Sequence, residues 1–449
     1  MSQELPPDVK GSEEVSSFVR HSDFEIRDSK RRDVVLIPFG SAGDVLPFIW
    51  LGRLLRERGH RVTIISSAPF DDFVRATGLS FVGLGTEAEF DEIIKNPDVW
   101  SAVRGPELIL ELAGDLTRRQ FEAIRAAVPD RRSALLIAPG TAFGARLARE
   151  KLGIPLISVN LQPICYISEY ETPIMGPHLA WMSRMPRWLK RLLFRLPNPL
   201  DRRAGPRVCA ACREEGVTPP RDIYFEWFHS PDGDLALFPS WFARPQPDWP
   251  PNVHQHTFPL EDLAREQRVS SELEEFIAAG PKPILFTPGS ANRHGAKFFD
   301  AAVRACTIRG WRAIFATRYA DQLPANLPAD ICAADYIPFG RVLPQCAAIV
   351  HHGGIGTTAQ GLAAGLPQLV MPMAHDQPDN ASRLIRLGVG RALPPRAFTP
   401  ERVGETLGEL TISPVVQRAA LALKDQLRTD RATDRMLDWI EARARARCQ

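Results

Sequence analysis

A short apolar strand that runs directly into a glycine turn and then into a helix occurs in both halves of the sequence. In the first half, residues 34–38 (VVLIP) predict a strand buried on both faces, followed by the glycine turn 39–44 and a helical spacing of apolar residues over 46–58. In the second half, residues 283–287 (PILFT) lead through a tight glycine turn into a helical segment over 298–307. Strand, glycine turn and helix in this order are typical of the opening of a parallel α/β sheet. The chain is therefore predicted to form two doubly wound, Rossmann-like α/β domains.

Further strands continue this pattern in each half and suggest the domain boundaries. Prolines crowd the stretch 240–259 (SWFARPQPDWPPNVHQHTFP), which excludes a helix or a central strand and indicates the connection between the domains. Two such domains that face each other place the carboxyl ends of their strands, where ligands bind, on a common crevice. We expect a mobile arm at 1–32, a first domain at 33–250, a second domain at 251–425 and a C-terminal helix at 426–449 that packs back on the first domain.

The charge balance excludes a protein that binds nucleic acid through a general excess of positive charge. The chain has 55 Lys and Arg against 53 Asp and Glu, a net charge of +2, whereas such binding needs many phosphate contacts. Seven scattered cysteines are typical of a reducing compartment. The first residues are acidic and polar, unlike a secretory signal, and no apolar run is long enough to cross a membrane. We expect a cytoplasmic protein.

The segment 181–207 departs from the general pattern because it is basic and amphipathic. It holds eight Lys or Arg and one acidic residue, interleaved with apolar side chains that include Trp181, Trp188 and Phe194. This composition is that of a helix able to lie on an anionic membrane, on the inner face of the membrane for a cytoplasmic protein. A helix that packs its apolar face on its own domain has the same composition, so the sequence leaves both alternatives open.

The strongest candidate site is the run 351–358 (HHGGIGTT), where a strand is expected to end at the two histidines and a helix to begin within the glycines. The start of a helix presents unpaired N–H groups and about half a positive charge, which suits a diphosphate. One strand later, His375, Asp376 and Gln377 follow beside the same crevice, where an acid and an amide suit the hydroxyls of a sugar. The alternative is a glycine turn that serves only close packing.

The sequence from HHGGIGTT to AGLPQLVMPMAHDQPDNASRL resembles the donor-binding signature of nucleotide-sugar-dependent glycosyltransferases of the GT-B fold, a UDP-glycosyltransferase-like family that glycosylates natural products, sterols and lipids. With GSAGDVLPF and HSPDGDLALFPSWFARPQPDW, the resemblance extends over residues 34–393 and is closest to the rhamnosyltransferases of rhamnolipid synthesis. It implies that the first domain binds the acceptor and the second domain binds the nucleotide sugar.

The resemblance also implies roles for single residues around the diphosphate. His352 would contact the α-phosphate, and Asp376 and Gln377 would hold the donor sugar. Ser290 matches a serine that reaches the phosphates from the opposing glycine loop. The residues that would surround the diphosphate and the donor sugar are His352, Gly353, Gly354, Gly356, Thr357, His375, Asp376 and Gln377.

The nucleobase would be bound by residues 336–339. Ile337 would offer backbone groups to the base, on which Tyr336 or Phe339 would stack. Plant members of the family carry Trp and Gln at the positions of Tyr336 and Phe339, and Glu at that of Gln360. These departures leave the choice between a dTDP-sugar and a UDP-sugar open.

The first domain supplies Asp44 as the candidate catalytic residue. Residues 43–47 (GDVLP) stand where many relatives carry Gly-His-x-x-Pro with a catalytic histidine, and they resemble the variant of several bacterial and sterol-type members. A carboxylate there takes the proton of the acceptor hydroxyl while the oxygen attacks the anomeric carbon, in one displacement with inversion. In the alternative, Asp44 only caps the helix that follows, since Asp is favoured at that position.

Three other patterns are predicted to be structural. The D-x-D of 232–234 is the metal-binding signature of the other major glycosyltransferase architecture, but it lies in a turn sequence before a strand. The CxxC of 209–212 lacks the second pair of ligands that a zinc site needs. His254 and His256 have no third ligand and are expected at the surface. We therefore expect no metal and no cofactor.

The sequence thus predicts an inverting glycosyltransferase that moves a hexosyl group, rhamnosyl included, from a dTDP- or UDP-sugar to a hydroxyl of an apolar lipid or natural-product acceptor. A non-catalytic nucleotide-binding partner of another glycosyltransferase is one alternative, and a nucleotide-sugar epimerase on the same fold is another. The presence of Asp44, Asp376 and Gln377 argues against the partner. No obvious pair of carboxylates stands beside the diphosphate loop, which argues against the epimerase.

Overall fold

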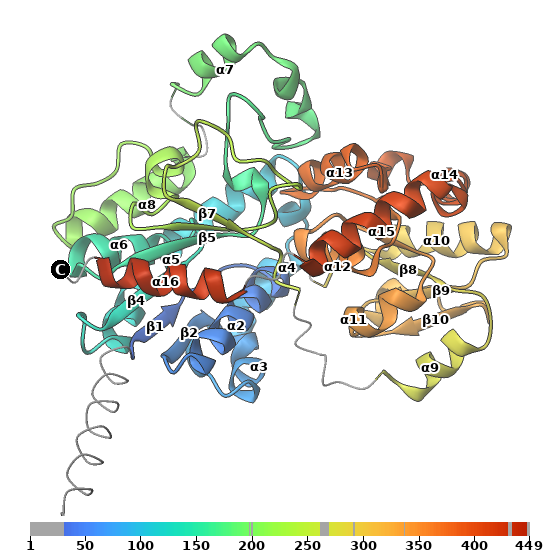
Figure 1. The fold of residues 1–449 in the computed structure, drawn as a ribbon, viewed down its shortest axis with the longest axis horizontal. Helices are drawn as coiled ribbons and strands as arrows, with labels where there is room; N and C mark the ends of the chain where they lie inside the picture. Colours follow the sequence, from blue (N-terminus) through green and yellow to red (C-terminus); the bar gives the residue numbers. More distant parts are fainter. Residues whose placement is uncertain are drawn as a thin grey trace, which may run out of the picture.

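The computed structural model describes residues 31–196, 198, 201–260, 269–290, 292–335, 337–429 and 433–446, so nearly all of the expected arm lies outside the described residues. Two parallel sheets lie side by side with helices around them (Figure 1). No helix within the described ranges combines the length and the apolar character that crossing a membrane requires. The two Rossmann-like domains predicted from the sequence are confirmed.

The first sheet has seven parallel strands in the order β3-β2-β1-β4-β5-β6-β7. Alternate residues of β1 point to opposite faces: Val34 and Leu36 join one buried apolar cluster, and Val35 joins another. Both faces of the sheet are therefore covered, as a parallel sheet requires. The strands are β1 (Asp33–Leu36), β2 (Arg61–Ser67), β3 (Ser80–Leu84), β4 (Ala134–Ala138), β5 (Leu156–Asn160), β6 (Asp234–Leu237) and β7 (Val253–His256).

The helices of the first domain follow these strands. The long helix α5 packs against α6 and α8 on one face of the sheet. Between β5 and β6 the chain makes a long excursion that contains α7 and α8. The helices are α2 (Ala42–Glu57), α3 (Asp71–Ala76), α4 (Glu87–Lys95), α5 (Arg104–Ala127), α6 (Phe143–Leu152), α7 (Arg187–Leu193) and α8 (Asp201–Glu214).

The second sheet has six parallel strands in the order β10-β9-β8-β11-β12-β13. They are β8 (Ile284–Thr287), β9 (Ala313–Ala316), β10 (Ile331–Ala334), β11 (Ala348–His351), β12 (Gln368–Val370) and β13 (Gly390–Ala392). The helices from this half of the chain are α9 (Ser271–Ala278), α10 (Ala296–Arg309), α11 (Phe339–Val342), α12 (Ile355–Ala364), α13 (Gln377–Arg386), α14 (Pro400–Ile412), α15 (Pro414–Thr429) and α16 (Thr433–Ala446).

The proline-rich stretch 240–259 is more than a connection, which corrects the boundary expected at residue 250. It contains β7, which pairs with β6 and forms the edge of the first sheet. The prolines precede and follow β7, so the strand keeps its N–H groups. The expectation that His254 and His256 lie at the surface is also wrong. His256 is buried, and the ring of His254 stacks on Trp439 at a centroid distance of 4.9 Å.

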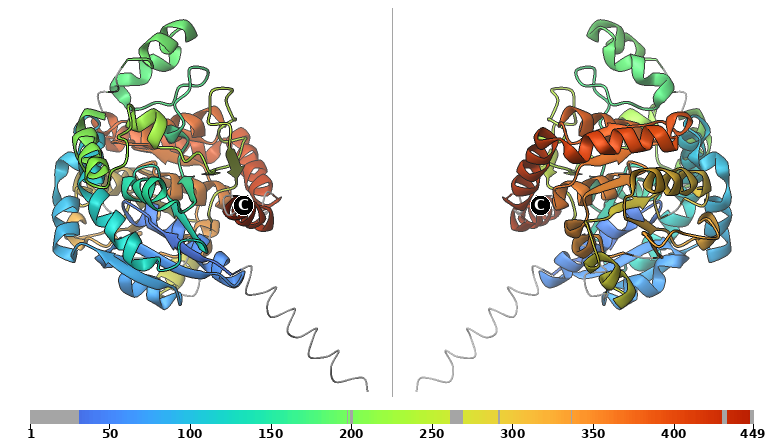
Figure 2. Two further views of the ribbon diagram at one scale, coloured as in Figure 1. Left: turned by 90° about the vertical axis from the view of Figure 1, so that its left-hand side faces the viewer. Right: turned by 90° about the vertical axis from the view of Figure 1, so that its right-hand side faces the viewer.

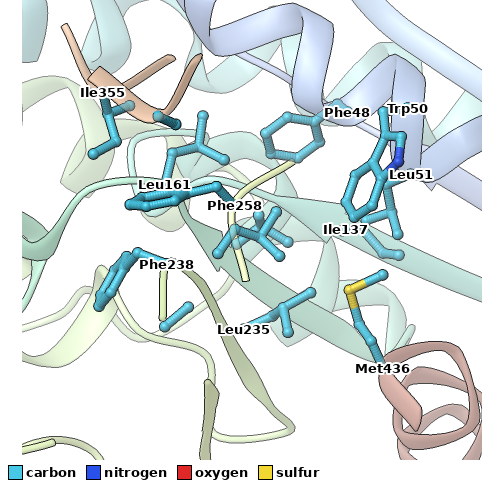
Figure 3. Close-up of a cluster of buried hydrophobic side chains, with 14 of the residues drawn as sticks. Phe48, Trp50, Leu51, Ile137, Leu161, Leu235, Phe238, Phe258, Ile355 and Met436 are labelled. Atoms are coloured by element: carbon cyan, nitrogen blue, oxygen red, sulfur yellow. The ribbon is translucent and has the colours of Figure 1, made fainter. Parts of the chain in front are cut away.

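Helix α16 returns to the first domain and completes its core. Met436 is fully buried in the cluster that contains Ile137 and Leu235 (Figure 3). At the rim, Arg58 pairs with Asp434 and Asp438, each at 2.8 Å. Since α15 continues to Thr429, the helix that contacts the first domain begins at Thr433 and not at residue 426.

The burial of Met436 generates a prediction about stability. Met436→Ala should lower the free energy of unfolding by about 2–4 kcal/mol, because the lost side chain leaves a cavity. The measurement is the urea midpoint of the unfolding transition. Asp434→Ala on the same helix is the control, since its side chain is 90% exposed, and it should leave the midpoint nearly unchanged. Equal midpoints for the two variants would contradict the packing of α16 on the first domain.

Candidate functional site

The loops that follow strands of both sheets meet at one place. Asp44 follows β1 and Gln162 follows β5 in the first domain, whereas Asp376 follows β12 in the second. Ile355, the first residue of α12, belongs to the same buried cluster as Leu161 of the first domain (Figure 3). The crevice at the carboxyl ends of the strands is therefore shared by the two domains, the position at which ligands bind in such sheets.

Asp44 lies in the first turn of α2, three residues after Ser41 at the N-cap. Its Oδ2 accepts hydrogen bonds from Ser41 N (2.9 Å) and Ser41 Oγ (3.0 Å), and its Oδ1 accepts one from Gln162 Nε2 (3.4 Å). Gly40 has φ 129°, and a Cβ there would collide with the carboxylate. Asp44 therefore helps to hold the start of α2, but Ser41 and not Asp44 occupies the N-cap.

The environment of Asp44 also changes its acidity. Burial raises the pKa of the carboxyl above its usual value, and the hydrogen bonds from Ser41 and Gln162 oppose this shift. A carboxylate with a raised pKa binds a proton more readily, which is the property of a general base. Gln162 was not identified from the sequence. The signal that could have identified it is a polar residue two positions after the end of β5, a buried strand of the parallel sheet.

The glycine turn after β11 is fixed by His351. This buried ring has Nε2 2.9 Å from Gln368 Oε1, and its Nδ1 accepts a hydrogen bond from Gly353 N at 3.1 Å. The proton is therefore on Nε2. Burial lowers the pKa of His351 to about 3, so the ring stays neutral. Its role is structural, because it holds Gly353 in a conformation with φ 97°.

The first turn of α12 is open to a ligand. Apart from its chain neighbours and the backbone of its own helix, no atom lies within 4 Å of the position that a Cβ would take at Gly356, which is exposed. The N–H groups of Gly356 and Thr357 belong to the first turn, where a helix leaves its amides without internal partners. Thr357 is half-buried, whereas Thr358 is fully buried. An anion can therefore approach this helix end as the sequence suggests.

His352 lies between two glycines beside that helix end. A Cβ at Gly289 would meet its Cε1 at 2.7 Å, and a Cβ at Gly354 would meet its Nε2 at 2.5 Å. Its Nδ1 is buried and has no hydrogen-bond partner among the described residues. Burial, followed by the charge of His375, lowers the pKa of His352 to about 4. A neutral ring with a free nitrogen can donate a hydrogen bond to a phosphate oxygen.

Asp376 connects the glycine turn to the first domain. Its Oδ2 accepts hydrogen bonds from Ile355 N (3.2 Å) and Asn380 Nδ2 (2.6 Å). Burial raises its pKa to about 7, and the negative charge of Asp44 is the second cause. Two carboxylates from different domains therefore lie close enough to interact. This pair was not found in the sequence, because the two residues are 332 positions apart.

The residues around Asp376 hold the loop in place. Gln377 is 2% exposed, and its Oε1 accepts hydrogen bonds from Met373 N (2.8 Å) and Ala374 N (3.1 Å). Its carboxamide oxygen is therefore occupied, and only its NH2 group is available to a sugar. Asn380 Nδ2 also donates to Gly353 O at 2.9 Å. Asn380 was missed in the sequence, although it stands one helical turn after Asp376.

His375 contacts the first domain. It is the one residue other than glycine with positive φ (57°) in the described part of the chain. Its Nε2 lies 2.8 Å from Val99 O, and its ring meets the edge of Trp100 at a centroid distance of 6.2 Å. The residue next to Asp376 is thus fixed across the domain boundary.

The structure describes some, but not all, of the residues expected to bind the nucleobase. Tyr336 lies outside the described residues. Ile337 is 5% exposed, so its side chain belongs to the core and only its backbone can face a base. Phe339 is half-buried at the start of α11, and Ser290 is exposed next to Gly289. Gln360 donates a hydrogen bond to Leu260 O at 3.4 Å.

A cavity of about 530 Å³ lies in the first domain near Asp44. Cys165 lines it, and the Sγ of this residue lies 3.8 Å from Gln162 Oε1, so Gln162 contacts both Asp44 and the cavity wall. This lining combines rings with polar and charged groups, which suits a largely apolar ligand that carries hydroxyls. The rings are those of Tyr166, Tyr224, Phe225, His229, Trp249, Pro231, Pro250 and Pro251, and the other polar and charged residues of the lining are Arg146, Glu226, Ser230, Asp248 and Asn252.

Both carboxylates of the D-x-D pattern make contacts within the first domain. Asp232 accepts hydrogen bonds from Arg149 at 2.7 and 2.8 Å, and the buried Asp234 accepts from Tyr166 OH and pairs with His229. The CxxC of 209–212 lies in α8 with both thiols free. Within the described ranges, no three His, Cys, Asp or Glu residues are grouped as metal ligands.

Comparison with known proteins identifies both halves of the chain. Residues 34–164 match the glycosyltransferase family 28 N-terminal domain, and residues 313–436 match the C-terminal domain of the erythromycin biosynthesis protein CIII-like family. The first match contains Asp44 and Gln162, and the second contains the glycine turn and Asp376.

Full-length relatives agree with these matches. The chain is 28% identical to the glycosyltransferase GtfC of Amycolatopsis orientalis, over 89% of this chain and 95% of that protein. It is 25% identical to a sterol 3-beta-glucosyltransferase of Arabidopsis thaliana, over 90% of this chain but 67% of that protein.

Among solved structures, the glycosyltransferase VinC in complex with dTDP has the same fold. Its TM-score is 0.65 at 18% identity, over 92% of this chain and 100% of that one. These comparisons give no support for the rhamnolipid rhamnosyltransferases in particular. The paired domains, the shared crevice and the matches to both halves show that the chain belongs to the GT-B glycosyltransferases.

Proposed function

We propose that the protein is an inverting glycosyltransferase that moves a hexosyl group from a dTDP- or UDP-sugar to a hydroxyl of an apolar acceptor. The observation that carries this proposal is that Asp44 and the open first turn of α12, which suits a diphosphate, lie in the same crevice. One domain supplies a buried carboxylate with a raised pKa. The other supplies an open helix start and a neutral histidine with an unpartnered nitrogen.

In the proposed reaction, Asp44 takes the proton of the acceptor hydroxyl while its oxygen bonds to the anomeric carbon. The bond from that carbon to the nucleoside diphosphate breaks, and the configuration inverts. Negative charge develops on the leaving diphosphate. The first-turn amides of α12 and an N–H of His352 stabilise this charge, and Asn380 holds the turn that carries them.

The donor sugar would lie against Asp376 and the free NH2 group of Gln377. VinC, solved with dTDP, supports a dTDP-sugar, and the resemblance of the glycine turn to UDP-glycosyltransferase-like proteins keeps a UDP-sugar as the other choice. Rhamnosyl remains among the hexosyl groups to be tested, because the sequence resemblance includes rhamnosyltransferases.

The acceptor would be an apolar lipid or natural product. The cavity next to Gln162 supports this class, because aromatic and proline rings form much of its lining and its polar groups could bind the hydroxyls of such an acceptor. A flat apolar molecule buried there could bring a hydroxyl to Asp44, since Gln162 contacts both. The sterol named for the plant relative belongs to this class.

The role of Asp44 as a base predicts a selective loss of turnover. Asp44→Asn should lower kcat by about 100- to 10,000-fold, the typical contribution of a positioned base, while the Kd for the nucleotide changes little. The measurement is transfer from a dTDP- or UDP-sugar to a panel of sterols and macrolide aglycones.

Ser41→Ala is the matched control for this variant. It removes the hydroxyl that binds Asp44 at the start of α2 but keeps the carboxylate. If Asp44 served only as a helix cap, the two variants would lose activity alike. Conversion of the nucleotide sugar into its epimer without any acceptor would instead support the epimerase.

The donor site predicts nucleotide binding that depends on His352. Calorimetry with dTDP and UDP in EDTA should show binding to the wild type, weakened about tenfold or more in His352→Ala, because a hydrogen bond to a charged phosphate is lost. His178→Ala, at an exposed position on η4 (Pro177–Arg184), should bind as the wild type does. Equal affinities in all three proteins would remove His352 from the donor site.

The raised pKa of Asp376 predicts a pH dependence of nucleotide affinity. The carboxyl is mostly neutral below pH about 7 and charged above it, so it repels a diphosphate only on the alkaline side. Affinity for dTDP should therefore fall as the pH rises through this value. In Asp376→Asn the fall should be smaller, and what remains reports the ionisation of the nucleotide itself. Identical profiles for the two proteins would contradict the placement of Asp376 beside the diphosphate.

A further inference from the structure

We propose that residues 177–196 form a projection that docks this protein on an anionic membrane surface. The projection consists of the 3₁₀ helix η4 (Pro177–Arg184), α7 and the residues to Leu196. It stands away from both sheets in Figure 1 and in the two side views of Figure 2. The docking itself is independent of the proposed function, and only its link to the acceptor rests on that function.

The structure divides the basic segment 181–207 into two parts with different surroundings. In α8, Arg203 pairs with Glu107 and Glu111, each at 3.1 Å, and Arg207 pairs with Asp115. These acids all belong to α5, so this part packs on its own domain. The projection, in contrast, leaves large apolar side chains in solvent.

Four apolar side chains of the projection are more than half exposed. The exposed fractions are 57% for Trp181, 69% for Trp188, 54% for Leu192 and 56% for Leu196. Trp188, Leu192 and Leu196 follow each other at intervals of four residues, so they line one side of α7 and its extension. A tryptophan and two leucines exposed along one side of a helix are unusual on a soluble surface and mark an interaction site.

The charges of the projection indicate an anionic partner. Residues 177–196 include no Asp or Glu, but they include five basic residues. Arg184 and Arg195 are exposed. Arg184 stands three residues after Trp181, and a 3₁₀ helix repeats every three residues, so the two share a side of η4. Cations beside tryptophans match the anionic headgroups and the interfacial region of a bilayer.

The remaining basic residues fix the shape of the projection. Arg191 and Arg187 both bind Glu169, and the hydrogen bonds from Arg191 lower the pKa of this acid to about 2. Lys190 is buried, and its Nζ donates to Ser183 O at 3.1 Å, which ties α7 to η4. These contacts therefore hold η4 and α7 in a fixed arrangement, with the apolar side of the projection exposed.

The base of the projection lies next to the proposed site. Glu171 pairs with Arg386 at 2.8 Å, and Ile174 N donates to Asp379 Oδ1 at 3.0 Å, so the chain leading into the projection contacts α13 directly after Asp376. At the other end, Phe194 contacts Phe225 of the cavity wall at a centroid distance of 6.1 Å. When the projection is docked, an apolar acceptor dissolved in the membrane would thus lie beside the cavity.

Vesicle flotation of the full chain tests the docking. The wild type should float with vesicles of phosphatidylcholine and phosphatidylglycerol, float less with phosphatidylcholine alone, and lose binding at high salt. Trp181→Ser/Trp188→Ser should bind the anionic vesicles at least about tenfold more weakly, and Arg184→Ser/Arg195→Ser should weaken binding by a similar factor. Arg187, Lys190 and Arg191 are left intact because they hold the projection together.

The control is Ile412→Ser/Val415→Ser, which removes two exposed apolar side chains, 78% and 65% exposed, from the end of α14 and the start of α15. It should float as the wild type does, and circular dichroism should show that all variants are folded. Three outcomes overturn the proposal: no flotation of the wild type, equal loss in the control, or self-association in solution that only the tryptophan variant abolishes. The last outcome assigns the projection to a protein interface.

Discussion

The burial of two carboxylates on opposite sides of one crevice is the constraint on which the site depends. Burial raises the pKa of both Asp44 and Asp376, and the charge of Asp44 acts on Asp376. Neither side chain could persist in such surroundings without hydrogen bonds, and Ser41, Gln162 and Asn380 supply these. An acidic pair held in this way can carry a proton on one member, which suits a reaction that moves a proton and expels a diphosphate.

The same crevice depends on contacts that tie the domains together. His375 accepts a strained backbone conformation and contacts Val99 O, and Arg383 binds Glu171 and Phe242 O. Strain of this kind persists where the surrounding structure fixes the residue. Since His375 adjoins Asp376, the placement of the second domain against the first also places Asp376 against Asp44.

Much of the fold followed from local sequence. Apolar runs such as 283–287 contain buried strands, here β8, because a strand covered on both faces must be apolar throughout. The structure of the stretch 240–259 was harder to predict, because the prolines on both sides of the short edge strand β7 are untypical of a strand. Single-residue roles were also harder. Gln377 was predicted to hold a sugar, yet its carbonyl binds the backbone of its own loop.

The sequence by itself determined the two parallel sheets, the glycine turn before α12 and the carboxylate after β1, because each depends on a few neighbouring residues. Only the tertiary structure decided the distant pairs: Asp44 with Gln162, and Asp376 with the charge of Asp44. It also separated the exposed projection from α8 within one basic segment. The physical reason is that composition records which side chains can be buried, whereas the packing of distant elements determines which of them are.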